Sequence, residues 1–507
     1  MTDKGEEEDK NIDKSGKDFS NYSTAGKYLL FILFFFIGII NHLGTILVMT
    51  GSRLLAYELS MKDYLTIYTS VATIFSVLTR IINSRLCLKT SYKKRIVIIC
   101  FWMICGYLSM YGVLTLHETV LHEQNVLCFV LSFIPCFFLG SSYAFGESAM
   151  LAYLRMFPDT LIAGWSSGTG FSGMVSGGLN FASQMINGLT LKLLYLFLSV
   201  LGPVYLILFT FTYRILKTTE RQTKRRNSVV EIKEPIQRDT NNSSASSNEI
   251  TPKITEKEKL EISEENKDEK EEAEKKLIGE EPNFIEEDAK SIKEEDEKAM
   301  EDMNKSNKIM SCSNYKAVMG MCGRVIINLG FIYFIQFFCV NTLIVRVCDR
   351  VDITFLPTAC SESHKAYRKG KFEFINLSYQ LGMFISKTFI KVIRKIQPIE
   401  VYSVSITMIT VLYVLEYFTG FFPWWSFLII GVILGIFSGG TYAGGFYTIL
   451  NSDQVKREYK ELTVNVATLF NDTGTFLSGL AGYLALKFVF KTTTAFPGQE
   501  IVNPPKC

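Results

Sequence analysis

Eleven long apolar runs constrain what this chain can fold into more than any other feature of its sequence. A helix that crosses a bilayer needs roughly 20 mostly apolar residues, and its backbone must satisfy its own hydrogen bonds there. The runs lie at 28–50, 64–82, 96–116, 126–151, 160–186, 193–213, 323–345, 372–393, 400–419, 424–450 and 462–489. They predict an all-α membrane protein with about eleven transmembrane helices, six before a central polar block and five after it.

The distribution of charge supports the membrane class and argues against several others. Charged residues make up 20% of the chain, but they are concentrated in the N-terminal tail and in the central block. The net charge is only +3, and basic residues are not interleaved with aromatic ones, so we expect no nucleic-acid partner. No zinc-binding, nucleophile-elbow, P-loop or dinucleotide motif is present, so we expect neither an enzyme nor a cofactor or metal site.

Composition divides the chain into five parts. We expect a disordered cytosolic tail at 1–27, a six-helix bundle at 28–213, a disordered acidic linker at 214–319, a five-helix bundle at 320–490 and a tail at 491–507. Lys and Arg gather in the short connections that share a side with the N-terminus, which places that side and the linker in the cytosol. The basic connection 346–371 is the exception, since this orientation puts it on the opposite side.

Two short features lie in the polar connections. Leu277 and Ile278 follow an acidic run in the linker and form a candidate signal for sorting adaptors of endosomes and lysosomes, with a chance Leu-Ile pair as the alternative. Cys348 and Cys360 lie in one predicted loop, where a disulfide and two free thiols are both open.

An internal repeat relates the two bundles. Residues 168–173 (GTGFSG) resemble residues 474–479 (GTFLSG), and Ser142-Tyr143-Ala144 resembles Thr441-Tyr442-Ala443. The offsets are 306 and 299 residues, so equivalent helices of the two bundles match. This pattern predicts two pseudo-repeated halves of a major-facilitator-like carrier, with the solute site near the bilayer midplane between them. The alternative is that small residues simply recur where helices pack.

Three stretches, 146–173, 379–387 and 439–480, resemble the battenin family of lysosomal and vacuolar membrane proteins. The segment from Trp165 to Gly170 reads WSSGTG, as in the family, and it follows the pair Gly146-Glu147. In the second half, residues 379–387 (YQLGMFISK) are similar to the family's YQxGxFxSR segment. The match also includes residues 439–442 (GGTY) and the pair Asp472-Thr473, and its order and spacing hold over about 28–489.

This resemblance implies an eleven-helix major-facilitator-like fold and residence in the lysosomal or vacuolar membrane. It also implies a role in clearing glycerophosphodiesters, and links to luminal pH and to basic amino acids. The sequence departs from the family in places: Gln336 stands where the family tends to have an acidic residue, Asn41-His42 replaces an Asn-Asn pair, and Lys387 replaces an arginine.

Ionisable residues inside apolar runs are costly and usually face a cavity or a partner. The candidates are Glu147, Asp472, Lys387, Arg80 and His42. Burial disfavours the charged form of a carboxylate, so Glu147 or Asp472 is a candidate site for a proton or for a substrate ammonium group. The alternative for both is a structural carboxylate bonded to a neighbouring helix. His42 is likewise either a pH sensor or a structurally bonded side chain.

A phosphodiester needs a cation and hydrogen-bond donors for its phosphate. Lys387 with Ser166, Ser167 and Thr169 meets that need, although the Gly/Ser run around them can equally serve helix packing alone. The other candidate substrate-binding residues are polar or aromatic groups on otherwise apolar helices: Asn41, His42, Trp165, Gln336, Tyr379, Gln380 and Asn471.

The function predicted from these patterns is that of a lysosomal or vacuolar transporter or efflux factor for small polar solutes. Its expected partners are membrane lipid, the solute, protons and the sorting adaptors. Two other functions remain open: an equilibrative nucleoside-type transporter, and a non-transporting regulator that acts through the 214–319 linker.

Overall fold

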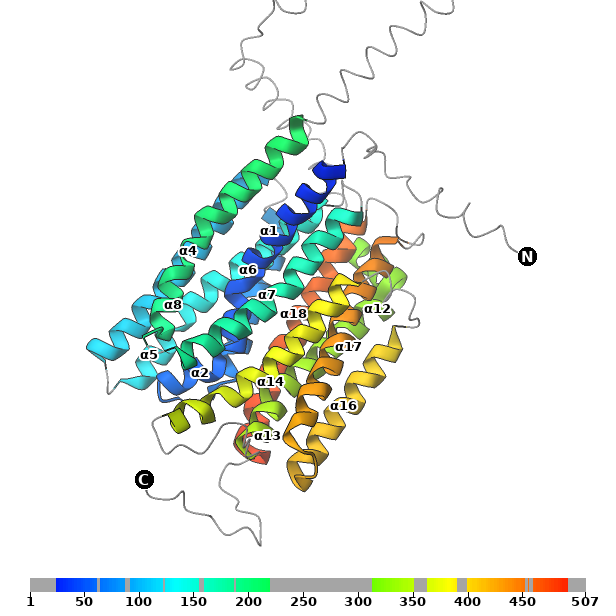
Figure 1. Cartoon of the computed structure of the whole chain (residues 1–507). Helices are drawn as coiled ribbons and strands as arrows, with labels where there is room; N and C mark the ends of the chain where they lie inside the picture. Colours follow the sequence, from blue (N-terminus) through cyan, green and yellow to red (C-terminus); the bar gives the residue numbers. More distant parts are fainter. Residues whose placement is uncertain are drawn as a thin grey trace, which may run out of the picture. The chain divides into compact units, whose positions relative to one another are not determined.

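The computed structural model describes residues 24–61, 64–86, 92–121, 124–154, 159–186, 188–218, 312–350, 363–389, 399–451, 455 and 459–490. Within these ranges the first half contains α1 (Thr24–Thr50), α2 (Ser52–Glu58), α3 (Ile67–Leu86), α4 (Tyr92–Thr119), α5 (Asn125–Leu131), α6 (Phe133–Leu154), α7 (Asp159–Met185) and α8 (Leu191–Leu198), followed by a helix over 201–218 (Figure 1). The second half contains α12 (Cys312–Phe338), the π-helix η5 (Cys339–Leu343), α13 (Ile344–Arg350), α14 (Ser363–Thr388), α16 (Glu400–Thr419), α17 (Trp424–Asn451), α18 (Lys460–Leu484) and the π-helix η7 (Ala485–Val489).

The predicted membrane class is confirmed by the length and composition of these helices. Seven helical segments of the described chain are long and apolar enough to cross a bilayer. Every predicted range overlaps a helix, but α3, α7, α14 and α18 fall outside these seven spans. They are more polar because they carry many of the hydroxyl, amide and charged side chains of the interior. The figure of eleven crossings therefore stays a prediction.

Some sequence predictions differ from the structure or lie beyond it. Helix α14 begins at Ser363, nine residues before the predicted start at 372, because its first residues are helical but too polar to register as an apolar run. The sorting signal at Leu277 and Ile278, Cys360 and the 491–507 tail lie outside the described residues.

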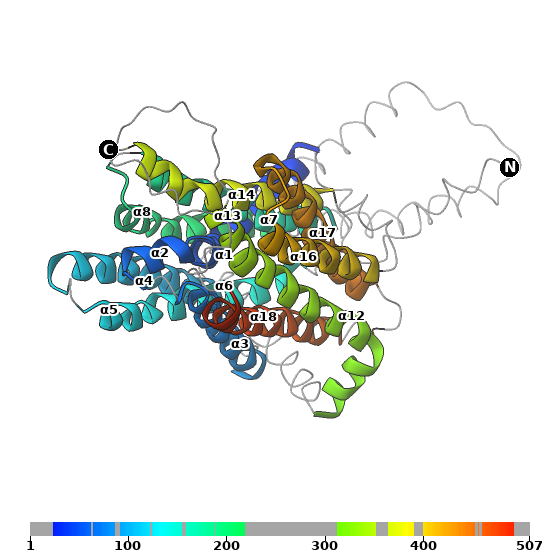
Figure 2. The ribbon, with the colours of Figure 1, turned by 90° about the horizontal axis from the view of Figure 1, so that it is seen from below.

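The helix contacts show two pseudo-repeated halves, as predicted. In the first half α1 packs on α7 and α3 packs on α6, whereas in the second half α12 packs on α18 and α14 on α17. Contacts between the halves run from α7 to α14 and from α18 to α3, and both pairs lie side by side in Figure 2. Helices α1, α3, α6 and α7 of the first half therefore correspond, in this order, to α12, α14, α17 and α18 of the second half. Each contact named above has an equivalent contact between the corresponding helices.

The repeated glycines explain why the sequence repeat exists. A Cβ on Gly168 would lie 2.0 Å from the carbonyl oxygen of Phe35 on α1, and a Cβ on Gly474 would lie 2.1 Å from that of Gly330 on α12. The first glycine of each repeat thus allows a close helix contact inside its own half.

The last glycine of each repeat faces the other half. A Cβ on Gly173 would meet the side-chain oxygen of Gln380 on α14, and a Cβ on Gly479 would meet the hydroxyl of Ser70 on α3. The alternative interpretation of the Gly/Ser run, that it packs helices, is therefore correct for these glycines.

We expect Gly168→Ala to destabilise the protein by about 1–3 kcal/mol, because the added methyl group meets backbone atoms that can move only with α1. Gly178→Ala on the same helix is the matched control, since a Cβ there meets nothing within 4 Å. Melting temperatures in detergent check the pair, and equal melting temperatures for the two variants would contradict this account of α1–α7 packing.

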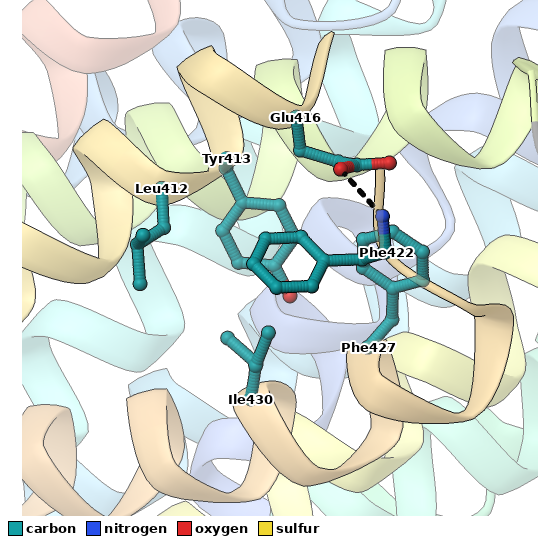
Figure 3. Close-up of a pocket in the computed structure, with 6 residues that line it drawn as sticks. All are labelled: Leu412, Tyr413, Glu416, Phe422, Phe427 and Ile430. Atoms are coloured by element: carbon teal, nitrogen blue, oxygen red, sulfur yellow. Dashed lines mark hydrogen bonds between the residues drawn. The ribbon is translucent and has the colours of Figure 1, made fainter. Parts of the chain in front are cut away.

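A small pocket lies at the hairpin between α16 and α17, lined by aromatic and aliphatic side chains and Glu416 (Figure 3). The Glu416 carboxylate accepts hydrogen bonds from the backbone N–H groups of Phe421 and Phe422, both at 3.0 Å. Gly420 ends α16 in the left-handed conformation (φ 62°). The buried carboxylate therefore holds this turn, and the pocket shares no residue with the charged cluster described next.

Candidate functional site

A buried arginine joins two carboxylates where α3, α6 and α18 meet. Arg80 on α3 donates from Nε to Asp472 on α18 at 2.6 Å and from Nη2 to Glu147 on α6 at 2.5 Å. Its Nη1 donates to the hydroxyl of Ser148 at 3.2 Å. The side chains of Arg80 and Glu147 are each only 2% exposed. Removing one partner of such a buried set strands a charge, which costs about 3–5 kcal/mol.

Glu147 has further partners on both halves. The phenol of Tyr442 on α17 donates to its Oε1 at 2.7 Å, and Nε2 of His42 on α1 lies 3.7 Å from the same oxygen. Gly146 leaves the space that the neighbouring Asn41 side chain fills, since a Cβ there would lie 1.7 Å from Asn41 Oδ1. In the Gly146-Glu147 pair, the glycine thus lets α1 pack closely on α6, and the next residue supplies the carboxylate.

The fourth charged side chain that links the halves is Lys387, near the end of α14. Its ammonium group lies 4.3 Å from the ring centroid of Tyr442 and 3.5 Å from Oγ1 of Thr169 on α7. The Thr169 hydroxyl donates to the carbonyl oxygen of Ser166 at 2.8 Å, which leaves its oxygen facing Lys387 as an acceptor. No Asp or Glu of the described residues pairs with Lys387, and Glu147 acts on it only at longer range.

Trp165 connects this lysine region to His42. The rings of His42 and Trp165 meet edge to face with centroids 5.8 Å apart, and Trp165 is one turn before Thr169 on α7. Trp165 is 1% exposed, and its indole Nε1–H has no hydrogen-bond acceptor within the described part of the chain. A buried donor of this kind usually has a partner.

The structure brings together six of the predicted site residues and leaves seven outside the charged network. Those that meet are His42, Glu147, Trp165, Thr169, Lys387 and Asp472. The others are buried polar groups that no hydrogen bond or ion pair within the described ranges connects to Arg80, Glu147, Asp472 or Lys387: Asn41, Ser166, Ser167, Gln336, Tyr379, Gln380 and Asn471. Of these, Asn41 donates to the carbonyl oxygen of Tyr143 at 3.3 Å and approaches His42, whereas both side-chain amide atoms of Gln336 are buried without a partner.

Sequence reasoning missed the tyrosines of the network and the central position of Arg80. Tyr442 bonds to Glu147, and the ring of Tyr143 lies 5.5 Å from the Arg80 guanidinium. Both tyrosines occupy the middle of the second repeated motif, so the repeat itself was the signal that could have identified them.

Three polar contacts in this network join one half of the protein to the other, so they hold the halves together and must break if the halves separate. Arg80–Glu147 lies within the first half, whereas Arg80–Asp472, Glu147–Tyr442 and Thr169–Lys387 each cross from one half to the other. Two cations, Arg80 and Lys387, and two carboxylates, Glu147 and Asp472, therefore lie where the halves meet.

Comparison with known proteins agrees with the fold and the resemblance. The family model described as CLN3 protein matches residues 32–491. A curated relative, "Battenin" of Dictyostelium discoideum, is 24% identical over 454 residues, which cover 88% of this chain and 91% of the relative.

Solved transporter structures have the same helix arrangement. A D-xylose-proton symporter matches with a TM-score of 0.51 at 8% identity and covers 91% of both chains. A POT family transporter in complex with 5-aminolevulinic acid matches with a TM-score of 0.50 at 11% identity and covers 92% of this chain and 91% of that one. At these identities the similarity shows a major-facilitator-like fold.

Proposed function

Because the chain belongs to the CLN3 protein family, we propose that it carries a small polar solute between its two halves across a lysosomal or vacuolar membrane. The solute class is the glycerophosphodiester, as the resemblance to battenin implies. Efflux coupled to protons would also tie the protein to luminal pH and, through it, to basic amino acid balance. The solved structure named as a D-xylose-proton symporter provides an example of a similar fold in proton-coupled transport of a polar solute.

One observation supports the proposal most strongly: the Arg80–Asp472 ion pair joins α3 of one half to α18 of the other. In a carrier with two halves, the site opens to one side when the halves separate there. Separation at α3 and α18 breaks this pair, whereas Arg80–Glu147 stays intact because both residues belong to the first half.

Proton coupling then belongs to Asp472. When Arg80 moves away with the first half, the Asp472 carboxylate stays in the second half without its cation, and a bound proton removes the cost of the unpaired charge. Glu147 keeps Arg80 in either state and serves as its permanent counter-ion. A proton from the acidic compartment thus favours the separated state.

Uptake of labelled glycerophosphocholine by proteoliposomes with an imposed pH gradient tests this function, with uridine as the competing solute. We expect gradient-dependent accumulation of the glycerophosphodiester and none of uridine. A variant with residues 219–311 replaced by a Gly/Ser linker should keep this flux. Flux of uridine alone, or no flux of either solute, would contradict the proposal.

A further inference from the structure

Like Arg80 in the first half, Lys387 is a buried cation on a helix that packs across to the other half. The equivalent contacts Gly173–Gln380 and Gly479–Ser70 relate α3 to α14 by 310 residues, so Lys387 lies about one helical turn before the position equivalent to Arg80. Arg80 is on α3, which packs across the halves on α18, and Lys387 is on α14, which packs across the halves on α7. Each half therefore has a buried cation on a helix through which it packs on the other half.

The surroundings of the two cations differ in charge. Arg80 is paired with Asp472 and Glu147, but the sequence-repeat offsets of 306 and 299 residues place Ser166 and Phe446 at the positions equivalent to those two carboxylates. Lys387 is left with a hydroxyl oxygen and a ring face, and its residue is only 5% exposed. Arg80 takes both carboxylates as its close partners, and Lys387 interacts with Glu147 only at longer range, so Lys387 is the cation of the two without a close carboxylate among the described residues.

A buried donor without an acceptor in the described ranges, the indole N–H of Trp165, lies one helical turn from the threonine that Lys387 contacts. Trp165 is on the same face of α7 as Thr169, the residue that the Lys387 ammonium group approaches, and lies one turn away from it. An ammonium group and an indole N–H are both donors, so what they require is an acceptor with negative charge.

We propose that Lys387 and Trp165 form the subsite that binds the phosphodiester anion of the solute, an inference that rests on the proposed transport function. Lys387 supplies the charge, Trp165 donates to a second phosphate oxygen, and Thr169 positions the ammonium group. A phosphodiester carries one negative charge and matches the one positive charge of Lys387, which has no close carboxylate in the described part of the chain. A phosphate monoester carries nearly two charges near neutral pH and leaves one of them unmatched.

The same geometry separates a binding role from a structural role for Lys387. A cation buried without a counter-ion destabilises the unliganded protein, so Lys387→Met should melt at the wild-type temperature or above it. A lysine kept only for structure should instead lower the melting temperature when it is replaced, because its contacts with Thr169 and Tyr442 are lost. Lys487→Met, at an exposed lysine that contacts Tyr483, is the matched control.

Binding of tritiated glycerophosphocholine to the full chain in nanodiscs tests the subsite. We expect Lys387→Met to weaken binding about 10- to 100-fold and Lys387→Arg to retain it, because a charged hydrogen bond to phosphate is lost only in the first. Trp165→Phe removes only the indole N–H and should weaken binding about 3- to 10-fold. Trp102→Phe, at a half-buried tryptophan on α4, should leave binding unchanged.

Competition identifies the source of the phosphodiester. Displacement by unlabelled glycerophosphoinositol assigns the subsite to a free diester, and displacement by lysophosphatidylcholine alone assigns it to a lipid headgroup; both support an anion subsite at Lys387. Wild-type binding that survives in Lys387→Met and in Trp165→Phe overturns the subsite while leaving transport intact. Absence of binding and flux in the wild type would instead overturn the proposed function.

Discussion

Replacing Arg80 with methionine is expected to prevent most of the protein from reaching a monodisperse folded state. The change leaves Glu147 and Asp472 as two carboxylates buried near each other without a cation, and stranding buried charges in this way costs about 3–5 kcal/mol. That loss is a large fraction of the total stability of a typical domain. Size-exclusion chromatography of a fluorescent fusion, together with the melting temperature in detergent, measures the effect.

A triple variant provides the matched control for this prediction. Combining Arg80→Met with Glu147→Gln and Asp472→Asn removes all three charges at nearly constant volume, so no carboxylate is left unpaired. Neutral replacements of a buried ionic set are often tolerated, and we expect the triple variant to recover most of the folded fraction. A single Arg80→Met variant that folds and melts like the wild type would show that Arg80 does not hold this network.

Asp472→Asn is expected to uncouple transport from the pH gradient while leaving solute exchange active. The amide resembles the protonated carboxylate, so the halves can separate without a proton, and Arg80 still has Glu147 as its counter-ion. Wild-type uptake should change by up to about tenfold per unit of luminal pH, the limit for one titrating carboxylate. Asp472→Asn should lose this dependence, whereas Asp472→Glu should keep it, and initial rates in proteoliposomes provide the comparison.

Glu147→Gln should behave differently, although it also removes one carboxylate of the pair. Arg80 then has its carboxylate partner only on the opposite half, and separation of the halves leaves the guanidinium without a counter-ion. We expect slow uptake at every pH, with the pH dependence retained. If Glu147→Gln loses pH dependence and Asp472→Asn keeps it, the assignment of the proton to Asp472 is wrong.

The fold was predictable from sequence because its signals are local. Apolar runs fix the helices through the cost of unpaired backbone groups in lipid, and the 306-residue offset relates α7 to α18. The repeated glycines were visible as a pattern, but their separate roles were not. Gly168 and Gly474 pack inside their own half, while Gly173 and Gly479 face the other half. This difference depends on which way each face of α7 and α18 points, and the sequence does not show that.

The candidate site was only partly predictable, because pairing is a long-range property. The sequence identified Glu147, Asp472, Lys387 and His42 as unusual charges, but it could not show that Arg80 takes both carboxylates and leaves Lys387 without one. Arg80 and Asp472 are 392 residues apart, and no periodicity links them. Polar residues such as Gln336 and Asn471 looked equally suitable for the site, yet no hydrogen bond within the described residues joins them to the network.

Movement between the halves can be tested directly with a reversible cross-link. A Cβ on Gly177 of α7 would lie 3.9 Å from Cβ of Leu377 on α14, close to the mean for a disulfide. The variant is Gly177→Cys with Leu377→Cys in a cysteine-depleted background that still transports. Gly178→Cys with Leu377→Cys is the control, since a Cβ at Gly178 meets nothing within 4 Å.

The decisive measurement is the initial rate of glycerophosphocholine uptake by this double variant before oxidation, after oxidation and after reduction. A carrier whose halves must separate should lose uptake when the cross-link forms and regain it with reductant, while the control pair transports throughout. Undiminished uptake by fully cross-linked protein would contradict the central claim that the solute crosses between moving halves.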